Sequence, residues 1–224
     1  IKEIIFIISK RKQIIKKYYY NDSFYKNLIK KKKDNKKLKL EYAKIKKYKK
    51  MIKFVYQNKP RGTGDAVLKC ANLIKSKHFL MLMPDDLIIM KNCSLSLIKL
   101  HKKYKSSVIA SKKVDKKSVS RWGIFDIKKI NNKDFIIKDV IEKPSIKSAP
   151  SNYAVIGRYI LPKEIFKILR KQKPGQNGEI HITDAIRTLI RKKNKFMGHL
   201  FAGKYLDCGT MNGYINSFTK ISKL

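Results

Sequence analysis

The sequence predicts an α/β fold, with a doubly wound, mostly parallel sheet and an added antiparallel β section. Short apolar runs alternate with longer helical stretches through the first half of the chain, as in sheets covered by helices. In the second half, three strand-like runs follow one another closely, as in hairpins. The hydrophobic fraction of 43% in 224 residues is enough for a substantial core. With no internal repeat and no Gly/Ser-rich linker, residues 1–224 are expected to form one domain.

The first half supplies the alternating elements of a Rossmann-like arrangement. The run Phe79–Met83 is wholly apolar, which is typical of a parallel strand covered on both faces. Apolar residues at helical spacing predict a helix over residues 64–74. The expected order is a strand at Ile4–Ile8, charged helical stretches to about Lys50, a strand at Ile52–Tyr56, the helix at 64–74, the strand at 79–83, a helix at Ser94–Tyr104 and a strand at Val108–Ser111.

The second half is expected to begin with strands and to continue with helices. The strands are predicted at Gly123–Ile130, Phe135–Ile141 and Tyr153–Leu161. The dipeptide Asn131-Asn132 predicts a hairpin turn between the first two of them. Pro162 is expected near the first position of the next helix, and Thr183 or Asp184 as the cap of the helix after it.

The formal net charge of +39 raises nucleic acid as a partner. The cations, however, are 48 Lys and only 7 Arg, whereas nucleic-acid sites depend on Arg for bidentate contacts and stacking. Lys, Ile, Asn and Tyr are all abundant and all have A/T-rich codons, so most of the charge is interpreted as coding bias at tolerant surface positions. The densest basic run, Lys30–Phe54, is then a solvated helix, and an RNA-binding or membrane-surface helix is the alternative. The remaining charge favours anionic, phosphorylated substrates.

The sequence indicates neither a membrane segment nor a metal-binding cysteine cluster. No stretch reaches the roughly 18 uninterrupted apolar residues of a membrane span. The first ten residues alternate apolar and charged side chains without a small-residue cleavage site, which favours a strand over a signal peptide. Cys70, Cys93 and Cys208 are far apart, so a reduced, cytoplasmic setting is the simplest interpretation.

The segment QNKPRGTGDAV joins the end of a strand to the start of a helix. The glycines Gly62 and Gly64 let the backbone approach a ligand, and a helix start offers free N–H donors. The amide of Gln57 both donates and accepts hydrogen bonds, which suits the edge of a uracil or thymine base. Two glycines at this spacing are weak evidence, and a plain strand-to-helix turn is the alternative.

The segment LMLMPDDLII places two carboxylates after a buried strand. Asp85 lies just beyond the strand end, where ligands of open α/β sheets gather. Mg²⁺ takes one or two carboxylates and completes its coordination with water and phosphate oxygens. The alternative is that Asp85 and Asp86 belong to a turn or a helix cap.

Further charged residues stand at other strand ends. Glu142 and Lys143 precede Pro144, where a carboxylate can hold sugar hydroxyls and a lysine can hold a phosphate. The alternative for this pair is a surface ion pair that contributes little. Gly123 opens a strand where bare backbone can meet a ligand, and Asp207 precedes Gly209 as a ligand or a turn residue.

These segments form an ordered series: Q-x4-G-x-G-x-A, LxPDD, WGI, EKP, SNYAVIGRYIL, GEI-x-x-TDA and YLDCGT. The series resembles the bacterial UTP–glucose-1-phosphate uridylyltransferases, or UDP-glucose pyrophosphorylases, within the nucleotide-sugar pyrophosphorylase family. The likeness covers nearly the whole chain and is dense from Phe54 to Tyr214. No single motif decides it, but the order of all of them is specific.

The resemblance implies a fold of the nucleotide-diphospho-sugar transferase type and a Mg²⁺-dependent reaction. UTP and glucose 1-phosphate would be the substrates, and UDP-glucose and pyrophosphate the products. The sugar phosphate oxygen attacks the α-phosphorus in line, which requires positioning and charge neutralisation more than covalent chemistry. Relatives form dimers and tetramers, so the resemblance also implies a homo-oligomer.

The resemblance assigns roles to residues by position. Asp85 and Lys143 would be catalytic, and Asp86 would be the more replaceable neighbour, which either supports the metal-binding aspartate without touching the ion or belongs to a turn. The matched residues are Asp85 and Asp207 for the metal, Gln57 and Gly62 for the uracil base, and Gly123, Glu142, Lys143, Asn152 and Gly157 for the sugar phosphate.

One departure concerns the start of the chain. The family begins with a strand and a glycine-rich loop that wraps the triphosphate, and Ile1 aligns with the second strand. On this alignment roughly 45 residues of the family's usual start, with that strand and loop, are expected to be missing from the chain, since a βα unit with its loops needs at least about 30. A fragment of this kind is expected to have negligible activity alone. The alternatives are a glucose-1-phosphate thymidylyltransferase, a non-catalytic nucleotide-sugar-binding paralogue and a basic nucleic-acid binder.

Overall fold

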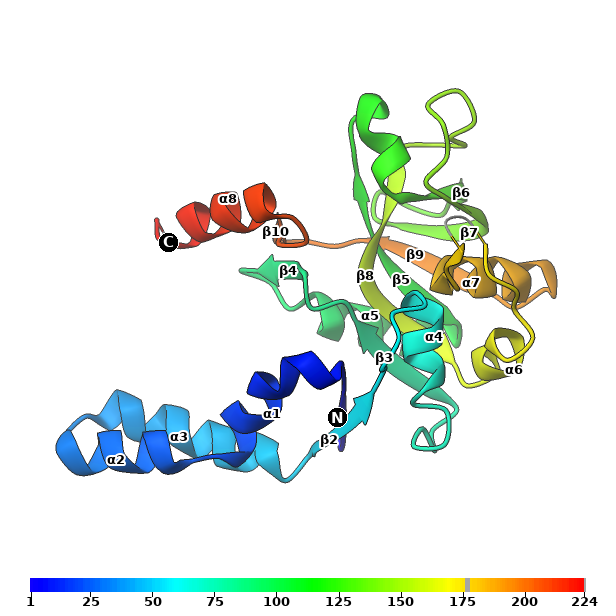
Figure 1. The fold of residues 1–224 in the computed structure, drawn as a ribbon. Coiled ribbons are helices and arrows are strands. Elements are labelled where there is room, and N and C mark those ends of the chain that lie inside the picture. Colours follow the sequence, from blue (N-terminus) through cyan, green and yellow to red (C-terminus); the bar gives the residue numbers. More distant parts are fainter. Residues whose placement is uncertain (176–177, 224) are drawn as a thin grey trace. The chain divides into compact units, whose positions relative to one another are not determined.

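The structure of the chain is a computed structural model that describes residues 1–175 and 178–223 (Figure 1). The chain divides into two compact units, Ile1–Leu73 and Ile74–Leu224. The predicted α/β fold with parallel strands and an antiparallel section is confirmed. The single-domain organisation stays a prediction.

The first unit is a parallel strand pair with a long helical connection. Its elements are β1 (Ile4–Ile8), η1 (Lys10–Lys12), α1 (Gln13–Tyr20), α2 (Ser23–Lys31), α3 (Lys36–Lys49), β2 (Ile52–Tyr56) and α4 (Thr63–Leu68). Both strands match their predicted bounds, and Ile4 pairs with Ile52. Asn35 caps α3, because its side-chain oxygen accepts a hydrogen bond from the Leu38 N–H at 2.9 Å. Within α3 only Ile45 is buried, as expected of a solvated helix.

The second unit is built on a six-stranded sheet in the order β3-β8-β5-β9-β7-β6. The strands are β3 (His78–Leu82), β5 (Ser107–Lys113), β6 (Gly123–Lys129), β7 (Asp134–Glu142), β8 (Tyr153–Pro162) and β9 (Phe196–Leu200). Among the described pairings of this sheet, β5–β9 is parallel and the rest are antiparallel. A separate antiparallel pair joins β4 (Asp86–Ile89) to β10 (Lys204–Asp207).

The parallel, fully covered strand predicted at Phe79–Met83 is wrong in two respects. The strand β3 pairs antiparallel with β8, and its residues are only partly buried, with Leu82 exposed. An uninterrupted apolar run reports contact with other apolar groups, and it carries no information about strand direction.

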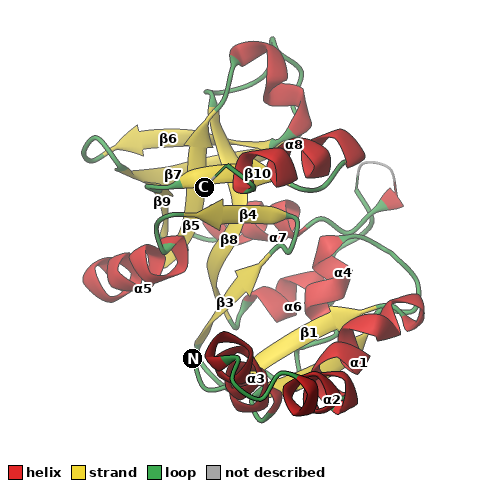
Figure 2. Cartoon of the chain, turned by 90° about the vertical axis from the view of Figure 1, so that its left-hand side faces the viewer, coloured by secondary structure: helices red, strands yellow, loops and turns green. Residues whose placement is uncertain are grey.

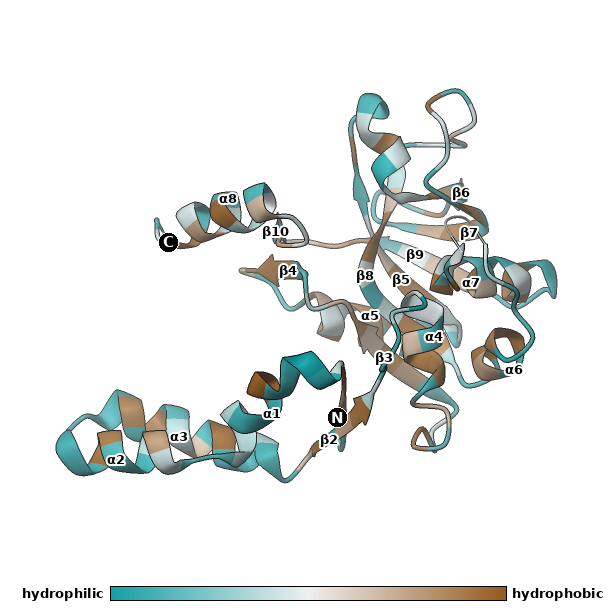
Figure 3. Cartoon of the chain, in the orientation of Figure 1, coloured by the Kyte–Doolittle hydropathy of each residue, from teal (hydrophilic) through white to brown (hydrophobic). Residues whose placement is uncertain are grey.

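Helices cover the six-stranded sheet on both sides, with α5 and α7 on opposite sides (Figure 2). The described helices of this unit are η2 (Lys116–Arg121), α5 (Cys93–Tyr104), α6 (Ile165–Leu169), α7 (Ile182–Arg191) and α8 (Met211–Ile221), and α8 packs on β10 instead of the six-stranded sheet. Leu97 of α5 packs on Val108 and Ala110, and all three are completely buried. Burying a leucine contributes roughly 1.5–3 kcal/mol, so this contact fixes α5 on the sheet. In Figure 3, much of β8, a strand of this six-stranded sheet, has the colours of apolar residues.

An ion pair fixes α7 to β7. The guanidinium of Arg187 donates from Nε and Nη2 to the Asp139 carboxylate, both at 2.9 Å. Burial works to raise the pKa of Asp139, but the hydrogen bonds from Arg187 and the Val140 N–H outweigh it and hold that pKa below its usual range. The pair therefore stabilises the helix whose first turn reaches the candidate site.

Several local predictions are also tested. The hairpin at Asn131 is confirmed, because its side-chain oxygen accepts hydrogen bonds from the N–H groups of Lys133 and Asp134. The helix predicted over residues 64–74 ends at Leu68. Pro162 ends β8 instead of opening a helix. In the described residues, no helix is long and apolar enough to cross a membrane.

Candidate active site

Two aspartates from different parts of the second unit converge at the ends of β3 and β10. Asp85 lies in the turn between β3 and β4, and Asp207 is the last residue of β10. The N–H of Cys208 donates to the Asp85 carbonyl at 2.8 Å, which holds the two segments together. A Cβ on Gly209 would lie 3.0 Å from Asp85 Oδ2 and 3.3 Å from Asp207 Oδ1. Both carboxylates therefore lie next to Gly209, whose N–H donates to Asp207 Oδ1 at 3.0 Å.

This donor set fits a magnesium ion. Mg²⁺ is usually bound through one or two carboxylates, with water and substrate phosphates filling the remaining positions. Within residues 1–175 and 178–223, no group of three or more His, Cys, Asp or Glu side chains is placed to hold a metal ion, so these two carboxylates alone would be the protein ligands. Arg121 approaches the other oxygen of Asp207 at 3.4 Å, but both side chains are substantially exposed, so this contact is weak.

Asp86 is the more constrained of the neighbouring aspartates. Its Oδ2 accepts the Gly157 N–H at 2.5 Å, and its Oδ1 accepts the Tyr205 hydroxyl. Burial raises the pKa of Asp86 above its usual range, against the opposing effect of these two hydrogen bonds. Burial and the Asp86 carboxylate also raise the pKa of Tyr205. These contacts agree with the expectation that Asp86 supports its neighbour without binding the ion; that it is the more replaceable aspartate stays a prediction.

A second corner forms where β6 begins and β7 ends. Gly123 is the strand partner of Glu142, and a Cβ on Gly123 would lie 3.2 Å from Glu142 Oε2. The hydroxyl of Thr183, in the first turn of α7, donates to the same Oε2 at 2.7 Å. Thr183 is not the helix cap, because α7 begins at Ile182 and its N-cap is His181. Glu142 is thus held in one orientation beside bare glycine backbone.

Lys143 follows Glu142 in an unusual backbone conformation. Its φ of 44° lies in the left-handed region, which non-glycine residues seldom adopt. Its N–H donates to the Trp122 carbonyl at 3.0 Å, and Pro144 beside it is buried. The Lys143 side chain itself is exposed. Such backbone strain persists where the surroundings enforce it, often at functional sites.

Asn152 and Gly157 occupy β8 and its approach, but neither has a described contact with Glu142. The Asn152 amide donates to the Val114 carbonyl at 3.2 Å, which joins β8 to the end of β5. Gly157 is buried, and a Cβ there would lie 2.5 Å from Asp86 Oδ2. The second aspartate therefore depends on this glycine.

Gln57 and Gly62, predicted to bind a base, come together in the first unit. The Gln57 side chain donates to the Gly62 carbonyl at 3.2 Å and to Asp65 Oδ2 at 2.8 Å. Gly62 has a φ of 100°, which admits the tight approach to α4 without strain. Asp65 is buried and also pairs with Lys69 at 3.3 Å. Because both N–H bonds of Gln57 are engaged, its amide presents an oxygen acceptor to a ligand.

A family model described as nucleotidyl transferase matches residues 4–223. The chain belongs to the nucleotidyl transferase family. A UTP–glucose-1-phosphate uridylyltransferase from Bacillus subtilis (strain 168) is 34% identical over 221 residues, which cover 97% of this chain and 74% of that protein. The resemblance found in the motif series is thereby confirmed.

Solved structures agree with this nucleotidyl transferase assignment. An apo UDP-glucose pyrophosphorylase superposes with a TM-score of 0.88 at 31% identity, covering 99% of this chain and 81% of that one. A UDP-glucose pyrophosphorylase complexed with UDP-glucose superposes with a TM-score of 0.81 at 33% identity, covering 98% of this chain and 81% of that one.

Sequence reasoning gave no site role to two side chains that lie beside the candidate site, Thr183 and Tyr205. Thr183 stood in a quoted motif but was assigned to a cap. Tyr205 stood in the quoted motif YLDCGT but was given no role, because its partner Asp86 is 119 residues away along the chain. For Thr183, the motif TDA after GEI was a usable signal; the Tyr205–Asp86 contact required the strand register.

Proposed function

We propose that this nucleotidyl transferase is a UTP–glucose-1-phosphate uridylyltransferase, which forms UDP-glucose and pyrophosphate. The observation that carries the proposal is the convergence of Asp85 and Asp207 around Gly209. In this reaction an oxygen of glucose 1-phosphate bonds to the α-phosphorus of UTP. The bond from that phosphorus to the β-phosphate oxygen breaks, and pyrophosphate leaves with its electron pair. The relatives of the same name and the UDP-glucose complex support the choice of substrates.

Asp85 and Asp207 would hold Mg²⁺ through carboxylate oxygens. When bound, the ion supplies positive charge that offsets the charge of the triphosphate and of the departing pyrophosphate. The aspartates contribute the orientation of that charge, since the Cys208 N–H fixes the Asp85 backbone to the end of β10. The choice of Mg²⁺ is supported by the two-carboxylate donor set.

Glu142 and Lys143 would hold the two ends of glucose 1-phosphate. Glu142 has the acceptor oxygens that sugar hydroxyls require, and the Thr183 hydroxyl fixes one of them at 2.7 Å. Lys143 supplies a point charge for the phosphate and directs it toward the α-phosphorus. The left-handed backbone at Lys143 supports this role, because it turns the chain at the end of β7.

Gln57 and Gly62 would read the nucleotide base. With its N–H bonds engaged by Gly62 and Asp65, Gln57 offers its oxygen to the imide N–H of uracil. Thymine carries the same imide, so this contact selects a pyrimidine dione and not uracil alone.

Three broader proposals accompany the activity. The three free cysteines fit a reducing, cytoplasmic location. A homo-oligomer is proposed from the family resemblance. Nucleic acid is not proposed as a partner, since lysine greatly outnumbers arginine. A gel shift at about 150 mM salt tests that last point, because nonspecific electrostatic binding weakens steeply with salt.

The activity is tested by pyrophosphate release with UTP, glucose 1-phosphate and Mg²⁺, together with calorimetric binding of UDP-glucose. UDP-glucose should bind, and Lys143→Ala should weaken glucose 1-phosphate binding. Asp85→Asn should abolish any pyrophosphate release while thermal unfolding stays cooperative. Preference for dTTP over UTP would replace the proposal with a thymidylyltransferase. Failure to bind either nucleotide sugar would overturn it.

A further inference from the structure

We propose that the hydrogen bond between Asp86 and Tyr205 fixes the separation of the Asp85 and Asp207 carboxylates. Asp86 and Tyr205, called the brace below, are then positioning residues for a divalent cation that Asp85 and Asp207 bind. The inference rests on the proposed function only for the identity of the cation site. Asp86 and Tyr205 hold the two chain segments that carry the cation ligands, and they need not touch the ion themselves.

The Asp86 carboxylate joins three strands. Asp86 opens β4, Gly157 lies within β8, and Tyr205 lies within β10. One carboxylate oxygen accepts the Gly157 N–H and the other accepts the Tyr205 hydroxyl. Since charge-assisted hydrogen bonds are shorter and stronger than neutral ones, this carboxylate is a firm junction between the six-stranded sheet and the β4–β10 pair.

The strand register brings this junction beside both cation ligands. Asp207 pairs directly with Asp86 across β10 and β4, and Tyr205 is two residues before Asp207 on the same strand face. Asp85 precedes Asp86 in the chain. Movement at the Asp86–Tyr205 contact would therefore be passed to the backbones of both ligands.

The direct pairing of Asp86 with Asp207 also favours a cation site at this place. Like charges opposite each other on neighbouring strands are destabilising. The Tyr205 hydroxyl donates into this acidic region and offsets part of the repulsion. An acidic pair that the fold must stabilise in this way is expected where a cation binds.

The Tyr205 ring is itself held from two sides. Trp122 lies against it in an edge-on arrangement, with ring centroids 5.9 Å apart. The ammonium of Lys112 is 5.0 Å from the Tyr205 centroid. These contacts favour the ring position in which its hydroxyl reaches Asp86.

The test measures Mn²⁺ binding to the purified chain by titration calorimetry, with electron paramagnetic resonance of free Mn²⁺ as a second readout. Tyr205→Phe and Asp86→Ala should raise the Kd for Mn²⁺ by about 10–100-fold, the usual effect of losing a group that orients metal ligands. Asp86→Asn should retain most of the affinity, because an amide can accept from Gly157 and donate to the Tyr205 oxygen.

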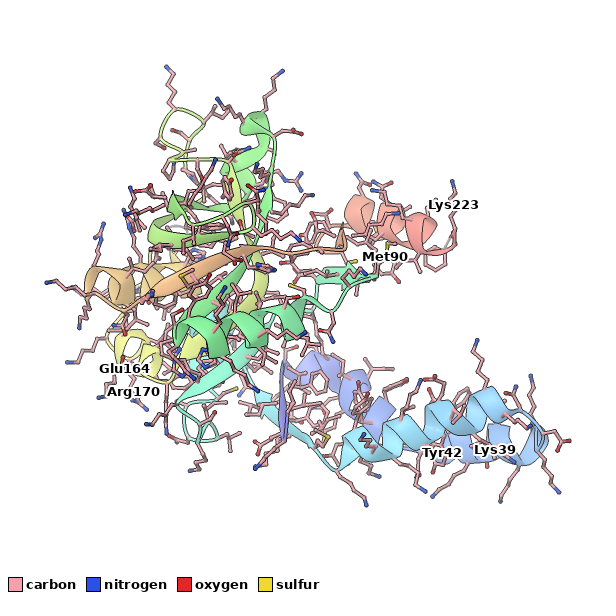
Figure 4. All side chains as sticks on the ribbon, turned by 180° about the vertical axis from the view of Figure 1, so that it is seen from behind. Lys39, Tyr42, Met90, Glu164, Arg170 and Lys223 are labelled. Atoms are coloured by element: carbon pink, nitrogen blue, oxygen red, sulfur yellow. The ribbon has the colours of Figure 1, made fainter. Side chains whose placement is uncertain are left out.

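Tyr42→Phe is the matched control. Its hydroxyl also donates to a carboxylate, Asp22 Oδ2 at 2.9 Å, but it lies on α3 in the first unit (Figure 4). This variant should bind Mn²⁺ with unchanged affinity. A loss equal to that of Tyr205→Phe would indicate a general effect of removing a tyrosine hydroxyl and would overturn the brace.

The remaining outcomes separate the brace from the cation site. If Asp85→Asn weakens Mn²⁺ binding while Tyr205→Phe does not, the brace is overturned and the site stands. If Asp86→Asn loses as much affinity as Asp86→Ala, Asp86 is a direct ligand, which also overturns the brace. If the unsubstituted chain does not bind Mn²⁺, the cation site of the proposed function fails, and the brace fails with it.

Discussion

Replacing Lys143 with glycine should make the protein more stable and the proposed site weaker. Lys143 has a φ of 44°, and a left-handed conformation costs an L-residue roughly 1–2 kcal/mol. Glycine adopts this conformation freely, but its greater freedom in the unfolded chain costs about 0.5–1 kcal/mol. The difference leaves a gain of about 1 kcal/mol. For a chain of this size, such a gain raises Tm by about 2–4 °C.

The same substitution removes a positive charge proposed to bind the sugar phosphate. Hydrogen bonds to charged groups contribute about 1.5–3 kcal/mol. The Kd for glucose 1-phosphate should therefore rise by about tenfold to a hundredfold. Because the change in binding and the change in stability have opposite signs, unfolding of the variant cannot account for the loss of binding.

Lys105→Gly is the control, measured by thermal unfolding and by calorimetric titration with glucose 1-phosphate. Lys105 caps α5 with a φ of 49°, and its N–H donates to the His101 carbonyl. Its replacement should raise Tm similarly and leave the Kd unchanged. A lower Tm for Lys143→Gly would refute the strain argument. An unchanged Kd for that variant, or an equal loss in Lys105→Gly, would refute the assigned role.

Three further predictions concern the surroundings of the site. Thr183→Val removes the donor to Glu142 and should raise the Kd for glucose 1-phosphate by about 2–10-fold, whereas Thr183→Ser should not. Gly157→Ala inserts a Cβ 2.5 Å from Asp86 Oδ2 and should lower the free energy of unfolding by about 1–3 kcal/mol in urea titrations; no change would contradict the packing. The pKa of Asp139 is held below its usual range in the folded protein. Its contribution to the free energy of unfolding is therefore present above its pKa in the unfolded chain, about 3.9, and is lost as pH falls through its pKa in the folded protein. Acid unfolding should therefore steepen below about pH 4, and Asp139→Asn should flatten that dependence.

Local patterns predicted strands at the places of β1, β2, β3, β5, β6, β7 and β8, but not β4, β9 or β10. Asp85 and Glu142 were identified because each follows a strand, and strand ends are visible in the apolar pattern. The antiparallel direction of β3 could not be predicted in this way. Direction depends on which strand lies beside β3, and its partner β8 begins 71 residues after β3 ends.

The hydrogen bonds around the site were harder to predict for the same reason. The Thr183–Glu142 contact joins residues 41 positions apart, and it depends on where α7 begins relative to the end of β7. A helix start is uncertain by one or two residues from sequence alone. A shift of one residue turns a side chain by about 100° around the helix, which is enough to turn a bonded threonine into a cap or a surface residue.

The adjacent aspartates Asp85 and Asp86 have different contacts and therefore different proposed roles. Asp86 is the first residue of β4 and Asp85 lies in the turn before it, so the two side chains have different surroundings. Asp86 begins β4 and is engaged by Gly157 and Tyr205, whereas Asp85 remains in the preceding turn and faces Asp207 across Gly209. If Asp86 had no such role, Asp86→Ala would leave the affinity for the cation unchanged. The contacts predict a loss of affinity in Asp86→Ala, because Asp86 holds the strands that carry Asp85 and Asp207.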